Sequence, residues 1–352
     1  MKICWWTNFR TANETALVDG LKRRGVDVVV CYFSEYDDYR RSIGWTPRDA
    51  GEGEFLVRSV GDARRKIGDF TERIQVVPSY ADGISWRLMA WCILHRKPWV
   101  ASLERSRNGW KGWPVRKAFA MLADTFARKV FCIGTAAMEQ FAKLGVRREK
   151  LVWTAYAMPR VQAGDAAVAH DGEAGVRFAF VGALTERKAV DVLAAAFGKV
   201  RSSHSSATLK VVGDGPLKSV FDGMDGVTIV GAVAPDQVNR AIAGCGVIVL
   251  PSRYDPWGVA LAEGACLGMA MIATSGVGAA EIIRESGDGA NGMVVPPGDV
   301  DALAEAMGRY AGNPALVAAH GRNARIAAAS LDADVLAEHV ESELRERGPI
   351  QG

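Results

Sequence analysis

The sequence has few cysteine and histidine residues, and their spacing matches no common metal site. The six cysteines form no C-x-x-C pair, and the five histidines form neither an H-E-x-x-H nor an H-x-H motif. We therefore expect neither structural zinc nor metal-dependent hydrolysis. We expect the cysteines to be small buried side chains in a reducing compartment. They are Cys4, Cys31, Cys92, Cys132, Cys245 and Cys266.

The sequence also lacks a long hydrophobic run. No stretch approaches the ~20 apolar residues that a membrane-spanning helix needs. The first eight residues turn polar after a short apolar run, without a signal-peptide cleavage site. We expect a cytoplasmic protein without a signal peptide. With 352 residues, of which 49% are hydrophobic and 24% charged, the chain is long enough for about two packed domains.

Charge is divided unevenly between the two halves. Residues 1–165 hold 28 Lys and Arg against 18 Asp and Glu, whereas residues 166–352 hold 15 against 22. Most tryptophans lie in the basic half, and segment 105–117 mixes cations with Trp110 and Trp113. Such a segment suits peripheral contact with an anionic membrane on its inner face, or an anionic acceptor; an ordinary solvated basic face is the alternative. No recognition-helix, RNP or zinc-finger pattern indicates nucleic acid.

Short apolar runs typical of strands alternate with helical stretches along the whole chain. In the first half we expect strands at 2–6, 27–33, 75–77, 99–103 and 130–133, and helices at 13–24, 85–95 and 115–128. In the second half we expect strands at 176–181, 208–212, 227–230, 247–250, 271–273 and 293–295. The expected helices there are 189–201, 217–221, 235–243, 261–267, 279–284 and several after 300. This alternation predicts an α/β protein with parallel sheets covered on both faces.

The domain boundary is predicted at a small, polar, aperiodic segment over 161–175, which is typical of a linker. We predict an N-terminal domain over 1–165 and a C-terminal domain over 166–335. A C-terminal helix over 336–352 is expected to cross back to the N-terminal domain. Two doubly wound domains in tandem place a cleft between the carboxyl ends of their sheets, which suits an enzyme with two substrates.

Gly213-Asp214-Gly215-Pro216 follows a predicted strand and precedes a predicted helix. Its N–H groups are candidates for binding a phosphate, although four such residues more often form a plain tight turn. The sequence has no complete G-x-G-x-x-G or P-loop motif. A nicotinamide cofactor and a P-loop nucleotide are therefore not expected.

The most informative segment is LPSRYDPWGVALAEGA, residues 250–265. It reads as a strand, a loop and a helix that begins near Gly258, so free N–H groups and a positive helix end could face a diphosphate. Asp255 lies on the loop, and Glu263 lies about one turn inside the helix. Ionised carboxylates only accept hydrogen bonds, so this pair suits sugar hydroxyls; a surface cap and a solvated Glu are the alternative.

This segment resembles the E-x7-E signature of family 4 glycosyltransferases, the glycosyl transferases group 1 type, which have the GT-B fold. Other segments of the second half match that family in order, whereas the first half matches only in the overall alternation of elements and in Leu144-Gly145-Val146 before Lys150-Leu151. These segments are FVGALTERK (180–188), VVGDGP (211–216), VG (230–231), SGVGAAEII (275–283) and NGMVVPPGD (291–299). The resemblance implies two Rossmann-like doubly wound domains that face each other across a cleft, with 1–165 as the acceptor-side domain and 166–335 as the nucleotide-sugar donor domain.

The resemblance also implies residue roles in binding a nucleotide diphosphate sugar that is UDP- or GDP-linked. Glu263 matches the family Glu that binds the ribose, and Asp255 matches the acid that meets the donor sugar. Lys188 and Arg187 match the cationic pair that neutralises the departing diphosphate, for which fixed cations suffice without a metal. The remaining donor-binding candidates are backbone groups at Gly182, Gly213, Gly215, Gly231, Trp257, Gly258 and Val259.

The sequence departs from the family pattern at three positions. Ala183 stands where the family has Arg, so a phosphate contact is missing or is replaced by Arg187. Asp255 is one methylene shorter than the usual Glu, which affects sugar preference or turnover. Glu104 stands where many relatives carry a His, and it is a candidate for contacting an acceptor hydroxyl or acting as a base; a salt bridge to Arg105 or Arg107 is the alternative.

Together these features predict a retaining, metal-independent glycosyltransferase. It would need no cofactor and would move a sugar from a nucleotide diphosphate sugar to a glycan or lipid-linked saccharide acceptor, as in cell-surface or exopolysaccharide biosynthesis. Two alternatives remain open. One is a nucleotide-sugar 2-epimerase of the same fold, which the scarcity of His disfavours. The other is a non-catalytic nucleotide-sugar-binding partner of another transferase, which Ala183 and Asp255 suggest.

Overall fold

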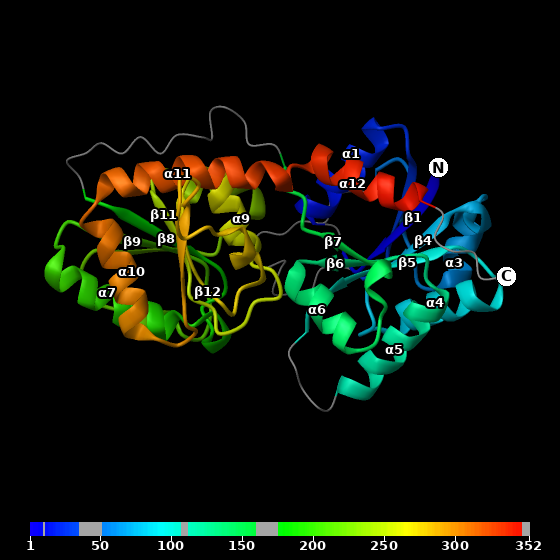
Figure 1. Cartoon of the computed structure of the whole chain (residues 1–352), viewed down its shortest axis with the longest axis horizontal. Helices are drawn as coiled ribbons and strands as arrows, with labels where there is room; N and C mark the ends of the chain where they lie inside the picture. The colour runs from blue at the N-terminus through cyan, green and yellow to red at the C-terminus, as the bar shows by residue number, and fades with distance from the viewer. Residues whose placement is uncertain (10, 35–50, 107–111, 160–174, 347–352) are drawn as a thin grey trace. The chain divides into compact units, whose positions relative to one another are not determined.

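The computed structural model describes residues 1–9, 11–34, 51–106, 112–159 and 175–346. The chain forms two units, each built around one parallel sheet (Figure 1). Unit 1 comprises Met1–Pro159 and Leu331–Gly352, and unit 2 comprises Arg160–Ser330. The predicted linker over 161–175 lies outside the described residues except for Gly175.

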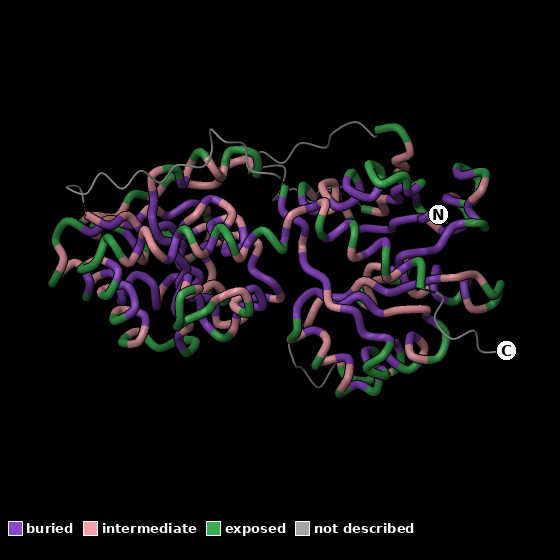
Figure 2. Tube along the Cα trace, turned by 45° about the horizontal axis from the view of Figure 1, so that its top comes forward, coloured by how far each residue is buried: buried purple, intermediate pink, exposed green. Residues whose placement is uncertain are grey.

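Unit 1 contains a seven-stranded parallel sheet in the order β3-β2-β1-β4-β5-β6-β7. The strands are β1 (Lys2–Thr7), β2 (Asp27–Tyr32), β3 (Glu54–Leu56), β4 (Ile74–Val77), β5 (Trp99–Glu104), β6 (Val130–Ile133) and β7 (Leu151–Thr154). The helices are α1 (Ala12–Arg23), α3 (Val60–Lys66), α4 (Gly83–Leu94), α5 (Trp113–Phe126), α6 (Thr135–Lys143) and α12 (Ala333–Arg345). Most strands are buried along their length because helices cover both faces (Figure 2).

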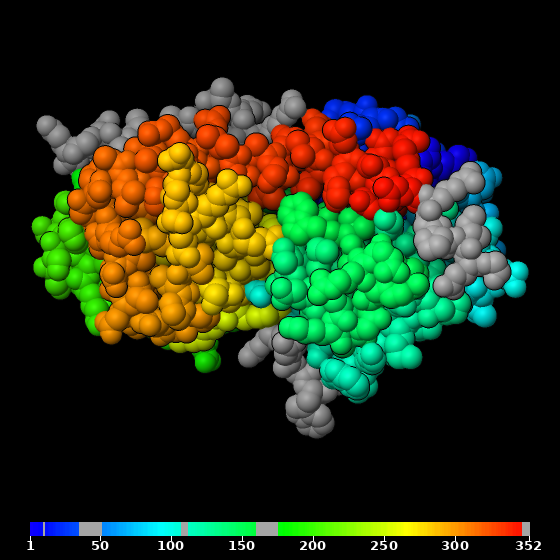
Figure 3. Space-filling view, viewed as in Figure 1, coloured from blue at the N-terminus to red at the C-terminus, as the bar shows by residue number. Residues whose placement is uncertain are grey.

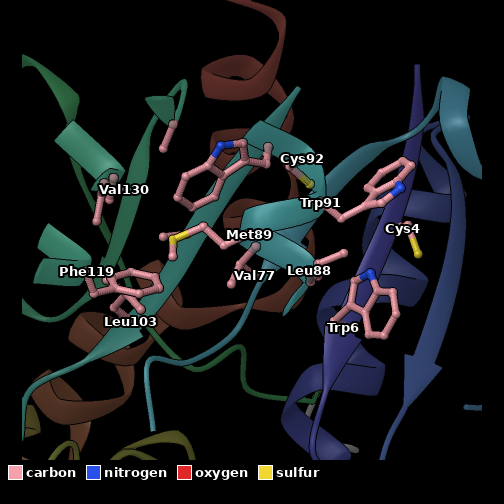
Figure 4. Packing of buried hydrophobic residues seen from close by; sticks show 14 of the residues in the cluster. Cys4, Trp6, Val77, Leu88, Met89, Trp91, Cys92, Leu103, Phe119 and Val130 are labelled. Atoms are coloured by element: carbon pink, nitrogen blue, oxygen red, sulfur yellow. The ribbon is translucent and has the colours of Figure 1, made fainter. Parts of the chain in front are cut away.

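One face of the unit 1 sheet packs an aromatic and sulfur-rich core (Figure 4). Trp99 meets Phe119 edge to face with ring centroids 6.4 Å apart. The buried indole N–H of Trp6 donates to Gln75 Oε1 at 2.9 Å, so this polar group is satisfied inside the core. This core packs against one face of the sheet, and α1 and α12 pack against the other face.

Helix α12 belongs to unit 1 and lies beside α1, as Figure 3 shows for the red and blue ends of the chain. Arg23 pairs with Asp334 at 2.5 Å, and Arg24 Nε donates to Glu341 Oε2 at 2.6 Å. Gly20 makes the close approach possible, because a Cβ there would lie 2.8 Å from Ala333 O. The two ends of the chain thus complete one unit.

Unit 2 contains a six-stranded parallel sheet in the order β10-β9-β8-β11-β12-β13. The strands are β8 (Arg177–Val181), β9 (Thr208–Val212), β10 (Val227–Gly231), β11 (Val247–Leu250), β12 (Ala270–Thr274) and β13 (Gly292–Val295). The helices are α7 (Val190–Ser203), α8 (Val238–Ala241), α9 (Val259–Cys266), α10 (Val300–Ala311) and α11 (Pro314–Ala328). Helices α7 and α10 pack together, as do α9 and α11 (Figure 1).

The structure corrects several predicted elements. The helices expected at 217–221 and 279–284 are 3₁₀ turns over Lys218–Phe221 and Gly278–Ile282. The helix expected at 235–243 is a 3₁₀ turn followed by the four-residue α8. Strands β3 and β7 and helices α3 and α6 were not predicted.

Five of the six cysteines are buried, as expected, Cys266 is half-buried, and all six are free. Among the described helices, none is both long and apolar enough to cross a membrane.

Candidate functional site

The predicted donor-binding residues of unit 2 lie where the strand order of its sheet reverses. Strand order runs outward from β8 on one side and from β11 on the other. Parallel sheets bind ligands at the carboxyl ends of strands beside such a switch. Lys188 follows β8, and Asp255 follows β11, so the switch point brings residues 67 positions apart into contact.

Lys188 and Asp255 form a mostly buried ion pair. The Lys188 ammonium lies 2.5 Å from Asp255 Oδ2, and their side chains are only 12% and 10% exposed. Arg187 approaches the other carboxylate oxygen at 3.7 Å and donates to Tyr254 O at 3.0 Å, while its side chain is 43% exposed. The two cations therefore converge on one carboxylate.

A second ion pair, not predicted from the sequence, holds these loops together. Arg253 donates two hydrogen bonds to the Asp191 carboxylate, at 2.9 and 2.7 Å, and a third to Glu186 O at 2.6 Å. Its own N–H donates to Arg187 O at 2.9 Å. Arg253 lowers the pKa of Asp191, which keeps this carboxylate ionised. In the sequence, a role for Arg253 was indicated by nothing more than its position within the matched 250–265 motif.

Helix α9 begins at Val259 with Gly258 as its N-cap, which agrees with the predicted start near Gly258. Gly258 has a φ of +100°, and a Cβ there would lie 2.6 Å from Val277 Cγ1. The loop before it is clamped by backbone bonds, in which Asp255 N–H donates to Gly276 O and Gly278 N–H donates to Asp255 O.

The start of α9 offers unused backbone donors. In the described parts of the chain, no hydrogen bond uses the N–H groups of Trp257, Gly258 or Val259. Free N–H groups at the start of a helix attract anions, both through their own hydrogen bonds and through the positive end of the helix dipole. Lys188 and Arg187 add positive charge to the same site through their shared contact with Asp255.

Glu263 lies in the second turn of α9, one turn inside the helix as predicted. Burial raises the pKa of its carboxyl from 4.5 to about 7. No described residue forms a hydrogen bond or ion pair with it. A half-buried carboxylate without a partner is costly, and hydroxyl groups of a ligand would satisfy it.

The candidate glycines at this edge allow close packing of the loops. A Cβ at Gly213 would lie 1.9 Å from Gly182 O, and one at Gly215 would lie 2.6 Å from Leu184 O. The N–H of Gly213 donates to Gly231 O, that of Gly182 to Val212 O, and that of Gly215 to the Asp214 side chain. Donation from these glycines to a phosphate therefore stays a prediction, and it would require these bonds to be exchanged.

Unit 1 holds the remaining candidate, Glu104, at the end of β5. It accepts a hydrogen bond from the Tyr156 hydroxyl, a partner that was not predicted. The basic segment 105–117 is described only in part. Arg116 is just 7% exposed and Lys117 donates to Leu144 O, so neither is the free surface cation expected there. Among described residues, no three His, Cys, Asp or Glu side chains could together hold a metal ion.

Comparison with known sequences places the similarity in unit 2. Residues 175–313 match the family of glycosyl transferases group 1. An exopolysaccharide phosphotransferase of Streptomyces coelicolor is 33% identical over 165 residues, which are 45% of this chain and 17% of that protein. The sulfoquinovosyl transferase of Arabidopsis thaliana is 30% identical over 125 residues, which are 34% of this chain and 24% of that protein. The matches thus span only a minor part of each of these two relatives.

Comparison with solved structures extends over the whole chain. Anabaena HepE in complex with UDP aligns with a TM-score of 0.76 at 17% identity, covering 98% of this chain and 99% of HepE. WaaG, a glycosyltransferase involved in lipopolysaccharide biosynthesis, aligns with a TM-score of 0.65 at 15% identity, covering 97% and 98% of the two chains. At these identities the likeness establishes the fold of both units.

Proposed function

We propose, on the premise that this chain has the GT-B fold and carries a glycosyl transferases group 1 domain over residues 175–313, that it transfers a sugar from a nucleotide diphosphate sugar. The observation that carries the proposal is the arrangement of side chains and backbone N–H groups around the start of α9 in unit 2. It combines an unpaired Glu263 carboxylate, free N–H groups at the start of α9 and two adjacent cations. These are the complements of a ribose and a diphosphate.

The donor would replace contacts that the protein now makes with itself. Lys188 exchanges its bond to Asp255 for a phosphate oxygen, and Asp255 is then available to accept from a hydroxyl of the donor sugar. Arg187, which is more exposed, supplies the positive charge that Ala183 does not. The leaving diphosphate develops negative charge, which these cations and the start of α9 stabilise without a metal.

The finer parts of the proposal come from the family resemblance and the neighbouring structures. Three structures of HepE contain UDP, UDP with glucose, or UDP-glucose, which favours UDP as the nucleotide. We propose transfer with retention of configuration to a glycan or lipid-linked saccharide, with Glu104 in unit 1 as an acceptor contact. The names of two relatives, an exopolysaccharide phosphotransferase and a sulfoquinovosyl transferase, concern extracellular polysaccharide and a sugar transfer.

Thermal unfolding tests donor binding. We expect one of UDP, GDP, ADP and CMP to raise the melting temperature of the protein, and we expect Glu263→Ala to abolish that shift because the ribose loses its acceptor. Glu305→Ala, on the exposed side of α10, is the control variant. The absence of a shift with every nucleotide would count against the proposal.

Turnover separates this activity from its two alternatives. Release of UDP from UDP-sugars in the presence of glycoside acceptors would support transfer and refute a purely binding role. Conversion of a UDP-sugar into its 2-epimer without an acceptor would support the epimerase. Lys188→Ala should reduce transfer by about 100-fold or more, since it removes a cation from the developing charge.

Membrane contact is a separate part of the proposal. The side chains that support it lie on helix α5. Trp113, Val115, Met121 and Phe126 on this helix are each about half exposed, at 53%, 47%, 57% and 49%. Exposed aromatic and aliphatic side chains on one helix suit insertion at a membrane interface. We expect the protein to float with anionic phosphatidylglycerol vesicles and Met121→Ser to weaken this. Val335→Ser on α12, also 49% exposed, is the matched control, and equal flotation of both variants would refute the contact.

A further inference from the structure

Arg253, on the loop after β11, forms four hydrogen bonds with one short segment after β8. Its guanidinium donates to both carboxylate oxygens of Asp191, at 2.9 and 2.7 Å, and to Glu186 O at 2.6 Å. Its backbone N–H donates to Arg187 O at 2.9 Å. We call these four bonds the Arg253 clamp. The clamp holds the chain on both sides of Lys188, which the proposed function assigns to the leaving diphosphate.

The turn that the clamp holds contains a strained residue. Ala189, directly after Lys188, has a φ of +55° and a ψ of +41°, which is the left-handed conformation. In the described parts of the chain, Arg96 is the only other non-glycine residue with a positive φ. A Cβ disfavours this conformation, and such residues persist where surrounding contacts hold them, often at functional sites. Without the clamp, we expect this turn to relax and Lys188 to move with it.

The clamp is the connection between the two loops that survives the exchange of partners in the proposed function. Lys188 now joins the loops through its 2.5 Å contact with Asp255, and the Arg187 guanidinium does so through Tyr254 O. Both cations release these contacts when they turn to the phosphates of a donor. The bonds from Arg253 use neither cationic side chain, so they remain when the donor binds.

The geometry of the clamp depends on arginine. The Arg253 and Asp191 side chains are 35% and 43% exposed, so solvent weakens their charge attraction. The planar guanidinium instead supplies N–H groups in fixed directions, which reach both Asp191 oxygens and Glu186 O together. Lysine would keep the charge but not these directions. The directions of the bonds, more than the charge, therefore set the position of the turn.

We propose that Arg253 is a positioning residue, which holds the strained turn 186–189 so that Lys188 and Arg187 face the diphosphate of the donor. Arg253 acts through this turn and not by contact with the donor. The inference rests on the proposed function, because it concerns the same donor site. It also divides that site, since the diphosphate depends on the turn whereas the ribose depends on Glu263 of α9.

Titration of the full chain with UDP and with uridine, followed by NMR, tests this role because uridine lacks the diphosphate. We expect Arg253→Lys to weaken UDP binding about tenfold and to leave uridine binding unchanged. Unchanged uridine binding also shows that the variant folds. Arg201→Lys is the matched control. Arg201 pairs with Asp225 and donates to Ala207 O, two residues that precede strands and so lie at the opposite edge of the unit 2 sheet.

A second substitution tests the strain in the turn. Glycine adopts the left-handed conformation without the penalty that a Cβ brings, so Ala189→Gly makes the turn less dependent on the clamp. Added to Arg253→Lys, it should restore UDP affinity to within about threefold of that of the unmodified protein. Failure of Ala189→Gly to restore any affinity would overturn the proposal, as would equal weakening of UDP and uridine binding by Arg253→Lys.

Amide hydrogen exchange without ligand separates this inference from the proposed function. The N–H groups of Lys188 and Ala189 donate within the turn to carbonyls three residues earlier. Their exchange should be faster in Arg253→Lys and unchanged in Arg201→Lys. If UDP binds all variants equally, the inference fails and the donor proposal survives. If UDP does not bind the unmodified protein, the proposed function fails. Exchange then still decides whether the clamp holds the turn, and equal exchange in the two variants would refute it.

Discussion

Two acidic side chains of the same motif differ in how their charge is balanced. Asp255 is held by Lys188 at 2.5 Å, with Arg187 nearby, whereas Glu263 has no partner among the described residues. A mostly buried ion pair and a lone half-buried carboxylate respond differently to substitution, because only the ion pair loses an attraction when its charge is removed. The two residues therefore allow opposite tests of the unit 2 site.

Asp255→Asn should tighten UDP binding while slowing transfer. The substitution removes the carboxylate that now competes with phosphate for Lys188. We expect the free energy of unfolding without ligand to fall by about 3 kcal/mol, since a mostly buried cation loses its partner. We expect UDP affinity to rise about fivefold, which corresponds to ~1 kcal/mol. Isothermal titration with UDP and an assay of transfer measure the two effects.

Asp301→Asn is the matched control for this prediction, because Asp301 pairs with Lys199 on an exposed surface of unit 2. It should change neither UDP affinity nor transfer. Weaker UDP binding in Asp255→Asn would show that Asp255 organises Lys188 for the phosphate instead of competing for it.

Glu263 should make stability and UDP binding depend on pH in opposite directions. Because its pKa is raised from 4.5 to about 7, the unfolded chain loses this proton first as pH rises. Its contribution to stability is thus complete below pH 4.5 and is lost by about pH 7. Glu263→Gln cannot ionise, so it should be about 2 kcal/mol more stable than the unmodified protein at pH 8 and equal to it at pH 4. Urea unfolding at both pH values measures this.

UDP affinity should instead rise with pH, since the ionised Glu263 accepts from both ribose hydroxyls. The affinity of the unmodified protein should fall by up to about tenfold for each pH unit below 7, and that of Glu263→Gln should be lower and flat. A pH profile that is identical in the two proteins would remove Glu263 from the nucleotide site.

At the scale of elements, the unit 2 site depends on loops that pack closely against each other at glycine residues. Gly213→Ala would place a Cβ 1.9 Å from Gly182 O, at a φ of +145°. Gly223→Ala has a positive φ of +70° but nothing within 4 Å of its Cβ, so it serves as the control. We expect Gly223→Ala to lower the free energy of unfolding by about 1 kcal/mol and Gly213→Ala to lower it by at least ~3 kcal/mol. Gly213→Ala should also weaken UDP binding. Equal losses of unfolding free energy would show that the loops do not need this contact.

The sequence predicted elements well where one signal dominated. Strands such as β11 and β12 are continuous apolar runs bounded by turn residues, and their bounds were placed within one residue. Short connections failed, because in segments such as 217–221 an apolar, turn-flanked run forms a 3₁₀ turn as readily as a helix. Strand β3 was missed because only three residues, none of them buried, form it at the edge of the sheet.

The candidate site could be predicted only where the type of a residue and its spacing in the sequence indicated the same position in the fold. The start of α9 follows from Gly258, and the position of Glu263 follows from helix periodicity. The pairing of Arg253 with Asp191, and of Tyr156 with Glu104, joins residues 62 and 52 positions apart. Such contacts depend on sheet order, and one sequence does not specify that order.

At the scale of the whole molecule, each unit has its own sheet and core, and the donor residues all lie in unit 2. Unit 1 is closed by α12, which the chain reaches only after completing unit 2. The two units should therefore unfold in separate steps, and a nucleotide that binds unit 2 should stabilise only one of them.

Gly20→Val tests this independence. Its side chain would enter the contact between α1 and α12, where a Cβ lies 2.9 Å from Ala337 Cβ, and should cost unit 1 about 2 kcal/mol. Gly308→Val on α10 of unit 2 meets nothing within 4 Å and is the control. We expect calorimetry to show two transitions, of which Gly20→Val lowers one and UDP raises the other. A single transition that both changes move would mean that the units fold as one, and the stability of α12 would then bear on donor binding as well.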